Sequence, residues 1–100
     1  MNKYVIKLLP KAYRDLEQIY TYVSDVLVEK VIALKLINEI EEIIFSLERF
    51  PYRGSERKIG IYMNKGYRQI FYHNFNIIYR IDEEKKYVII VTVRYSKSNF

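Results

Sequence analysis

The stretch YRQIFYHNFNIIYRIDEEKKYVIIVTV, residues 67–93, decides the fold class. Its first part holds two runs of aromatic and β-branched residues, 67–72 and 75–81, a composition typical of strands. His73-Asn74 separates the two runs, and asparagine tolerates the left-handed backbone angles that a tight turn needs. This part of the chain therefore predicts a β-hairpin.

The second part of the stretch predicts another hairpin connection and a buried strand. The charged run 82–86 has the polarity of a turn. Residues 87–93 are nearly all apolar and β-branched, which is typical of a central strand covered on both faces. Near the start of the chain, residues 4–9 form a further β-prone run, which Pro10 closes because proline cannot continue a sheet ladder.

Between these β-prone runs the apolar residues change to a helical period. In residues 11–25 they recur every three or four positions, so we expect an amphipathic helix of about three turns. A second helix is expected from about Glu29 to Phe50, with Pro51 ending it. Its apolar stripe consists of Ala33, Ile37, Ile40, Ile44 and Leu47. Only a few residues join the two helices, which favours an antiparallel helical hairpin.

The order of these elements predicts an α+β fold. The order is β-α-α-β-β-β, and we expect the helical hairpin to pack on one face of a mostly antiparallel four-stranded sheet. A chain of 100 residues fits one compact domain, so residues 1–100 are expected to form a single unit.

The composition excludes several classes of protein. The chain has no cysteine, which excludes disulfides and thiolate metal sites. No apolar run is long enough for a signal peptide or a membrane span, so we expect a cytoplasmic protein without membrane contact. The only histidine, His73, lies in an expected turn with no further ligands at metal spacing, and no metal or cofactor is expected.

The net charge of +5 is unevenly distributed along the chain. Residues 1–50 hold seven Lys/Arg against eight Asp/Glu, a balance of −1, whereas residues 51–100 hold ten against four, a balance of +6. The cations of the second half are Arg53, Arg57, Lys58, Lys65, Arg68, Arg80, Lys85, Lys86, Arg94 and Lys97. A one-sided basic surface attracts nucleic acid or an acidic protein partner. On charge alone, ordinary surface cations are the simpler explanation.

Three motifs, in this order along the chain, resemble the RelE/ParE family of bacterial toxins. They are DLEQIYTYV at residues 15–23, INEIEEIIFSLERFPYRG at residues 37–54 and YHNFNIIYRID at residues 72–82. Within the second motif, Leu47, Pro51 and Gly54 match the way the family's second helix commonly ends. The C-terminal VRYSKSNF is similar to the family's ending, with Tyr95 in place of a histidine and Lys97 in place of an arginine.

The resemblance implies the toxin of a type II toxin–antitoxin system, a class associated with plasmid stabilisation. Such a toxin inhibits growth until a cognate acidic antitoxin neutralises it, in a complex that can be of higher order. ParE-like members are associated with inhibition of DNA gyrase, and RelE-like members cut messenger RNA on the ribosome. A non-toxic nucleic-acid-binding module is a third hypothesis, although no recognition motif is present.

The residues that RNA cleavage requires are incomplete. Cleavage without a metal needs a base for the 2′-hydroxyl, positive charge at the phosphate and an acid for the leaving oxygen. The resemblance to RelE-like enzymes implies the set Arg68, Arg94, Tyr95 and Lys97, if the chain is a metal-independent endoribonuclease. However, Asn76 lies where RelE-like enzymes have a third-strand arginine, and Ser96 lies where YoeB-like toxins have a histidine. These departures favour the ParE-like, gyrase-targeting function.

Four further cations are predicted to contact the target or a nucleic acid. They are Arg53, Arg57, Lys58 and Lys65, in the irregular stretch 52–65. Structural alternatives stay open for the strand cations. Arg68 is as readily a solvated strand cation as a functional one, and Arg80 is better explained by a surface pair with a glutamate. The tyrosines beside cations, Tyr52, Tyr62, Tyr67 and Tyr95, are better explained by packing than by stacking on bases.

Overall fold

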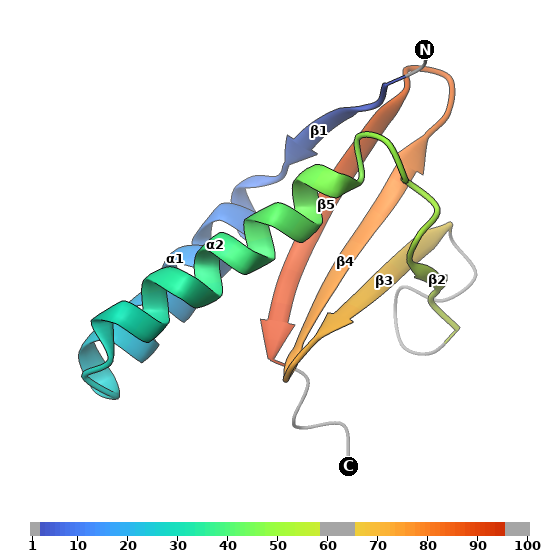
Figure 1. Cartoon of the computed structure of the whole chain (residues 1–100). Helices are drawn as coiled ribbons and strands as arrows, with labels where there is room; N and C mark the ends of the chain where they lie inside the picture. The colour runs from blue at the N-terminus through green and yellow to red at the C-terminus, as the bar shows by residue number, and fades with distance from the viewer. Residues whose placement is uncertain (1–2, 59–65, 96–100) are drawn as a thin grey trace.

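In the computed structural model, which describes residues 3–58 and 66–95, two helices pack on one face of a sheet (Figure 1). The elements are β1 (Val5–Leu8), α1 (Pro10–Thr21), a π-helical turn (Tyr22–Val26), α2 (Lys30–Ser46), β2 (Ser55–Glu56), β3 (Tyr67–Tyr72), β4 (Phe75–Asp82) and β5 (Tyr87–Tyr95). The predicted α+β class, the helical hairpin and the two β-hairpins are confirmed.

The sheet has five strands in the order β1-β5-β4-β3-β2, so the prediction of four strands is wrong. The additional strand is the two-residue β2, where Ser55 and Glu56 pair with Gln69 and Arg68 at the edge. Two polar residues carry no β-prone pattern, and they become a strand only because β3 offers them an edge. β1 is parallel to β5, and the other pairings are antiparallel.

Several element boundaries differ from those expected. Pro10 is the first residue of α1, where its missing N–H has no intrahelical partner to lose. α2 ends at Ser46 and not at Phe50, because the next residues form tighter turns, such as Leu47 N–H to the Ile44 carbonyl at 3.1 Å. In the β3–β4 turn the left-handed residue is His73, with φ of 53°, and not Asn74. Histidine, like asparagine, is enriched at positive φ.

The core lies between the helical hairpin and one face of the sheet. Its fully buried members include Ile40 and Ile44 from α2 and Ile77, Tyr79 and Ile90 from the sheet. β5 lies between β1 and β4, and six consecutive residues of it are buried, which confirms the predicted central strand.

α1 also closes the edge of β5 beyond the end of β1. The carboxylate of Asp15 accepts the backbone N–H of Val93 at 3.1 Å and the hydroxyl of Thr92. An unpaired strand edge is a template for wrong pairing, and Asp15 caps it with a partly buried acceptor. None of the helices in the described part of the chain is long and apolar enough to cross a membrane.

Candidate functional site

Strand register divides the candidate residues between the two faces of the sheet. Arg68 pairs with Tyr79, whose side chain belongs to the core, so both lie on the helix-packed face. Asn76 is three residues before Tyr79 on β4 and therefore points to the opposite side, which we call the distal face. Arg94 pairs with Asn76 and lies on the distal face as well. The sheet thus separates Arg68 from Arg94, and Lys97 lies outside the described residues.

Arg68 holds the loop that follows α2. Its Nη2 atom donates to the backbone carbonyls of Tyr52, at 3.3 Å, and Gly54, and its guanidinium lies 5.1 Å from the centre of the Tyr52 ring. Beside it, the Tyr79 hydroxyl donates to the Pro51 carbonyl at 2.7 Å and accepts the Gly54 N–H at 3.1 Å. Arg68 is therefore not a solvated cation, and its contacts position a loop.

Gly54 is required at this loop because two groups approach it closely. A Cβ atom there would lie 2.6 Å from both the Gln69 carbonyl oxygen and the Tyr79 hydroxyl. Burial raises the pKa of the Tyr79 hydroxyl, which keeps its proton available for the Pro51 carbonyl. The Pro51 and Gly54 positions of the sequence pattern are thus explained by contacts between this loop and the sheet, and Leu47 belongs to the core.

On the distal face, three polar side chains from neighbouring segments meet. Arg57, which follows β2, donates through Nη1 to the Gln69 side-chain oxygen at 2.6 Å, and the Asn76 amide donates to the same oxygen at 3.1 Å. Arg57 is 9% exposed and Asn76 is 1% exposed. Two of their buried atoms, Arg57 Nε and Asn76 Oδ1, have no hydrogen-bond partner. We call Arg57, Gln69 and Asn76 the distal cluster.

The distal cluster could not be predicted from the sequence. The sequence predicts that Arg57 contacts the target, and it shows Asn76 where RelE-like enzymes have an arginine. No sequence pattern indicates that the two residues lie close together. They meet because the unpredicted β2 pairs with β3, so that the Arg57 N–H bonds to the Tyr67 carbonyl at 2.9 Å. A cation is therefore adjacent to Asn76, but it comes from a different strand than the one expected.

The other predicted site residues are scattered. Arg53 and Lys58 are exposed, and Arg53 Nη1 donates to the Ser46 hydroxyl at 2.7 Å. Arg94 and Tyr95 are exposed at the end of β5, where the Tyr95 ring lies 5.6 Å from that of Phe75. Lys65 lies outside the described residues.

Neither Arg80 nor His73 has the surroundings of a catalytic or metal-binding residue within the described part of the chain. Arg80 is exposed opposite Tyr67 and Ile89, so its register partners are not the glutamate that we expected. His73 packs its ring edge-on against Tyr72, with 4.3 Å between ring centres. In residues 3–58 and 66–95, no three His, Cys, Asp or Glu side chains are grouped to hold a metal ion.

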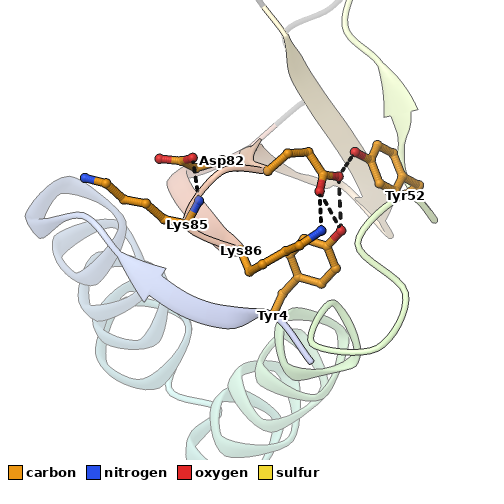
Figure 2. Close-up of polar contacts among 6 residues, drawn as sticks. Tyr4, Tyr52, Asp82, Lys85 and Lys86 are labelled. Carbon is orange, nitrogen blue, oxygen red and sulfur yellow. Dashed lines mark hydrogen bonds and ion pairs between the residues drawn. The ribbon is translucent and has the colours of Figure 1, made fainter. Parts of the chain in front are cut away.

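A second polar cluster, centred on Glu83, joins three distant segments of the chain. Figure 2 shows its members Tyr4, Tyr52 and Lys86. Glu83, in the β4–β5 turn, accepts the Tyr4 hydroxyl at 2.9 Å, the Lys86 ammonium at 2.9 Å and the Tyr52 hydroxyl. The Tyr52 hydrogen bond and then Lys86 lower the pKa of Glu83 from 4.5 to about 2. The same Glu83 hydrogen bond raises the pKa of Tyr52. No sequence pattern predicts this cluster, because its members are far apart in the chain.

The helical hairpin carries a groove of about 930 Å³. It lies between α1 and α2, and its lining includes Tyr13, Tyr20, Ile37 and Phe45 together with charged residues such as Glu17. Near the end of the hairpin, apolar side chains are exposed, including Val26 and Val31. This groove is an apolar surface with the dimensions of a binding site.

The comparisons with known proteins agree with this architecture. The family model described as the ParE toxin of the type II toxin–antitoxin system parDE matches residues 6–100. The chain belongs to this family. The resemblance drawn from the sequence motifs is thereby confirmed. A search of curated proteins found no match to this ParE-family chain.

Solved structures share the fold of this ParE-family chain. A structure of the chromosomal ParDE toxin–antitoxin system from P. aeruginosa is 23% identical, with a TM-score of 0.79, covering 97% of this chain and 100% of that one. The toxin–antitoxin complex RelBE2 from Mycobacterium tuberculosis is also 23% identical, with a TM-score of 0.70 and coverage of 95% and 93%. A YoeB/ParE toxin from Agrobacterium tumefaciens is 16% identical, with a TM-score of 0.63 and coverage of 91% and 96%.

Proposed function

We propose that this type II toxin inhibits growth in the cytoplasm by binding DNA gyrase, until a cognate acidic antitoxin neutralises it. Membership of the ParE toxin family supports the toxin assignment, and the fold is shared with chains of the ParDE and RelBE2 systems. The gyrase target is inferred from the resemblance to ParE-like toxins.

One observation carries the choice of a protein target over RNA cleavage. The cations that a RelE-like mechanism would use are not assembled on one surface. Arg68 is bonded to loop carbonyls on the helix-packed face. On the distal face, Asn76 lies where the resemblance to RelE-like enzymes implies an arginine. Phosphate cleavage needs preorganised positive charge at one point, and this separation of charges argues against it.

The test is controlled expression of the chain, followed by comparison of two responses. A gyrase poison causes DNA damage, so we expect a DNA-damage reporter to rise before any loss of intact transcripts. Messenger RNA cut at codon positions before the reporter rises would contradict the proposal. Co-expression of the cognate antitoxin is expected to abolish the response.

A ribosome-dependent, metal-independent endoribonuclease is the second candidate, because the distal face also holds two arginines. Arg57 bonds to Gln69 beside Asn76, and Arg94 is paired with Asn76 on β5. If this candidate is correct, the double variant Arg57→Gln, Arg94→Gln stays folded and loses all transcript cleavage. Arg68 is unsuitable for this test, since its loss would disturb the loop that it holds.

We also propose where the antitoxin binds. A partly disordered acidic segment would cover the basic distal face, where Arg57, Arg80 and Arg94 lie, and an apolar part of it would occupy the hairpin groove.

A further inference from the structure

The far end of the helical hairpin is an apolar surface that the described strands do not cover. Figure 1 shows this end of α1 and α2 reaching beyond the sheet. Five large aliphatic side chains there are half exposed or more, and we call them the hairpin tip: Leu27, Val28, Val31, Ile32 and Leu34. None of the five lines the groove between α1 and α2, so the hairpin tip is a separate surface.

The first part of α2 has the composition of a helix that is covered on more than one side. Residues 31–37, VIALKLI, hold a single charged residue, Lys35. Ala33 is buried, whereas Val31 is 80% exposed. A helix on a protein surface normally has polar residues on the side away from the core, and a helix that is apolar all round is normally buried. The exposed side of this part of α2 is therefore typical of an interface.

Val28 combines a strained backbone with an exposed apolar side chain. Its φ of 54° lies in the left-handed region, which a β-branched residue rarely adopts and which glycine adopts without steric cost. The residue is 76% exposed, so burial within the free chain does not offset the strain. Strained residues persist where their side chains have a function. This combination indicates that the Val28 side chain contacts a partner outside the free chain.

The charges around the hairpin tip are balanced. Asp25, Glu29, Lys30 and Lys35 are all exposed, which gives two acidic and two basic side chains. Nucleic acids and anionic membranes are bound by surfaces with an excess of positive charge, and the hairpin tip has none. Within the described residues, neither ion pair involves Glu29 or Lys35. An apolar protein surface with charges of both signs is the partner that fits.

We propose that the hairpin tip binds the hairpin tip of a second copy of this chain, with the two α2 helices antiparallel and a twofold axis beside Ile32. Twofold symmetry requires a surface that complements itself. Glu29 comes three residues before Ile32 and Lys35 three residues after it, so the antiparallel arrangement places each Glu29 opposite Lys35 of the second copy. The apolar side chains of the two tips, those of Val28 included, then cover each other.

The size of the hairpin tip predicts a weak dimer. A stable interface buries about 800 Å² on each partner. Five half-exposed aliphatic side chains supply several hundred Å², and the interface is completed only by polar neighbours such as Lys35. The dimer is therefore reversible, and its population depends on the protein concentration.

The direct test is sedimentation velocity of the full-length protein, free of antitoxin, at concentrations from 10 to 300 µM. We expect the sedimentation coefficient to rise from the monomer value towards the dimer value. Glu29→Lys and Lys35→Glu should each weaken the dimer by about tenfold, because like charges then face each other. An equimolar mixture of the two variants should restore it, since each copy again meets the opposite charge. A monomer at every concentration would overturn the proposal, and so would a dimer that neither variant weakens.

A matched pair of variants separates the hairpin tip from general surface hydrophobicity. Val31→Lys places a charge beside the twofold axis, and we expect it to be monomeric over the whole concentration range. Val5→Lys is the same substitution at a residue of β1 that is 50% exposed, and a change within about threefold is expected. Equal effects of the two variants would contradict the proposal. Flotation of the wild type with phosphatidylglycerol vesicles, lost in Val31→Lys, would assign the tip to a membrane surface and would also contradict it.

Val28→Gly distinguishes a role in the dimer from a role in folding. Glycine removes the backbone strain together with the side chain, so the dilute variant should melt at the temperature of the wild type or higher. At high concentration the same variant should dimerise about tenfold more weakly. A lowered melting temperature in dilute solution, with unchanged dimerisation, would show that Val28 serves the monomer and would count against the proposal. These measurements use neither gyrase nor antitoxin, so their outcome is independent of the proposed function.

Discussion

At the scale of single residues, close contacts explain positions that the sequence only marked. Gly54 lies against the Gln69 carbonyl and the Tyr79 hydroxyl, and Arg68 donates to the loop on the same side. Each of these residues is polar or small, so hydrophobic periodicity gives no information about them. Their roles depend on which segments pair, which is a property of the folded chain.

We expect Gly54→Ala to destabilise the protein, because the new Cβ would lie 2.6 Å from two oxygen atoms. Overpacking of this kind costs about 1–3 kcal/mol, and each kcal/mol lowers the melting temperature of a domain of this size by roughly 4–8 °C. Thermal unfolding followed by circular dichroism measures the change. Ser55→Ala, at the exposed next residue, is the control. A Gly54→Ala variant as stable as this control would show that the loop can move away from the sheet at no cost in stability.

The Glu83 cluster predicts a pH dependence of stability. Hydrogen bonds from Tyr52 and Lys86 lower the pKa of Glu83 to about 2, from 4.5. A group with a lowered pKa in the folded state stabilises fully above its unfolded pKa and loses that contribution as pH falls. The contribution of Glu83 is therefore expected to be lost between pH 4.5 and about 2.

Glu83→Gln tests this pH dependence in urea unfolding experiments. The wild type should lose its stability advantage over the variant across that acidic range, and the advantage should be constant between pH 6 and 8. Because Glu83 is exposed, the effect should also shrink in high salt. An advantage that persists unchanged at pH 2 would mean that the carboxylate charge does not matter.

At the scale of elements, the sequence predicted the helices and strands that have a regular hydrophobic pattern. The helical stripes, the buried β5 run and the β3–β4 hairpin were all visible, because burial imposes a period of 3.6 or 2 on the chain. The two-residue β2 and the early end of α2 were not, since backbone hydrogen bonding to a partner decides them. The same holds for the candidate site. The sequence marked Arg94 and Asn76 individually, but the position of Arg57 beside Asn76 depends on the pairing of β2 with β3.

The contact between α1 and β5 predicts a loss of stability in Asp15→Ala. The carboxylate accepts the Val93 N–H at 3.1 Å and the Thr92 hydroxyl, and the Asp15 side chain is 12% exposed. Leaving these donors unsatisfied costs about 1–3 kcal/mol. Glu17→Ala, at an exposed position of α1, is the matched control for charge and helix propensity. Equal urea midpoints for the two variants would contradict the capping role.

At the scale of the whole molecule, charge and apolar surface are distributed over different parts. The net charge is +5, the strands carry arginines on the distal face, and the hairpin groove is lined largely by apolar and aromatic side chains. An antitoxin that covers both parts is held by ionic and apolar contacts together. We expect its affinity to fall as salt rises from 50 to 500 mM, measured by calorimetry, because exposed charges are screened. Affinity independent of salt would place the interface in the groove alone.

We propose that this ParE-family toxin acts on gyrase and does not cut RNA. The most direct measurement is DNA supercoiling by purified gyrase in the presence of the purified chain. We expect inhibition of supercoiling, reversed by the antitoxin, with no cleavage of messenger RNA on purified ribosomes. Unimpaired supercoiling together with ribosome-dependent cleavage of messenger RNA would contradict it.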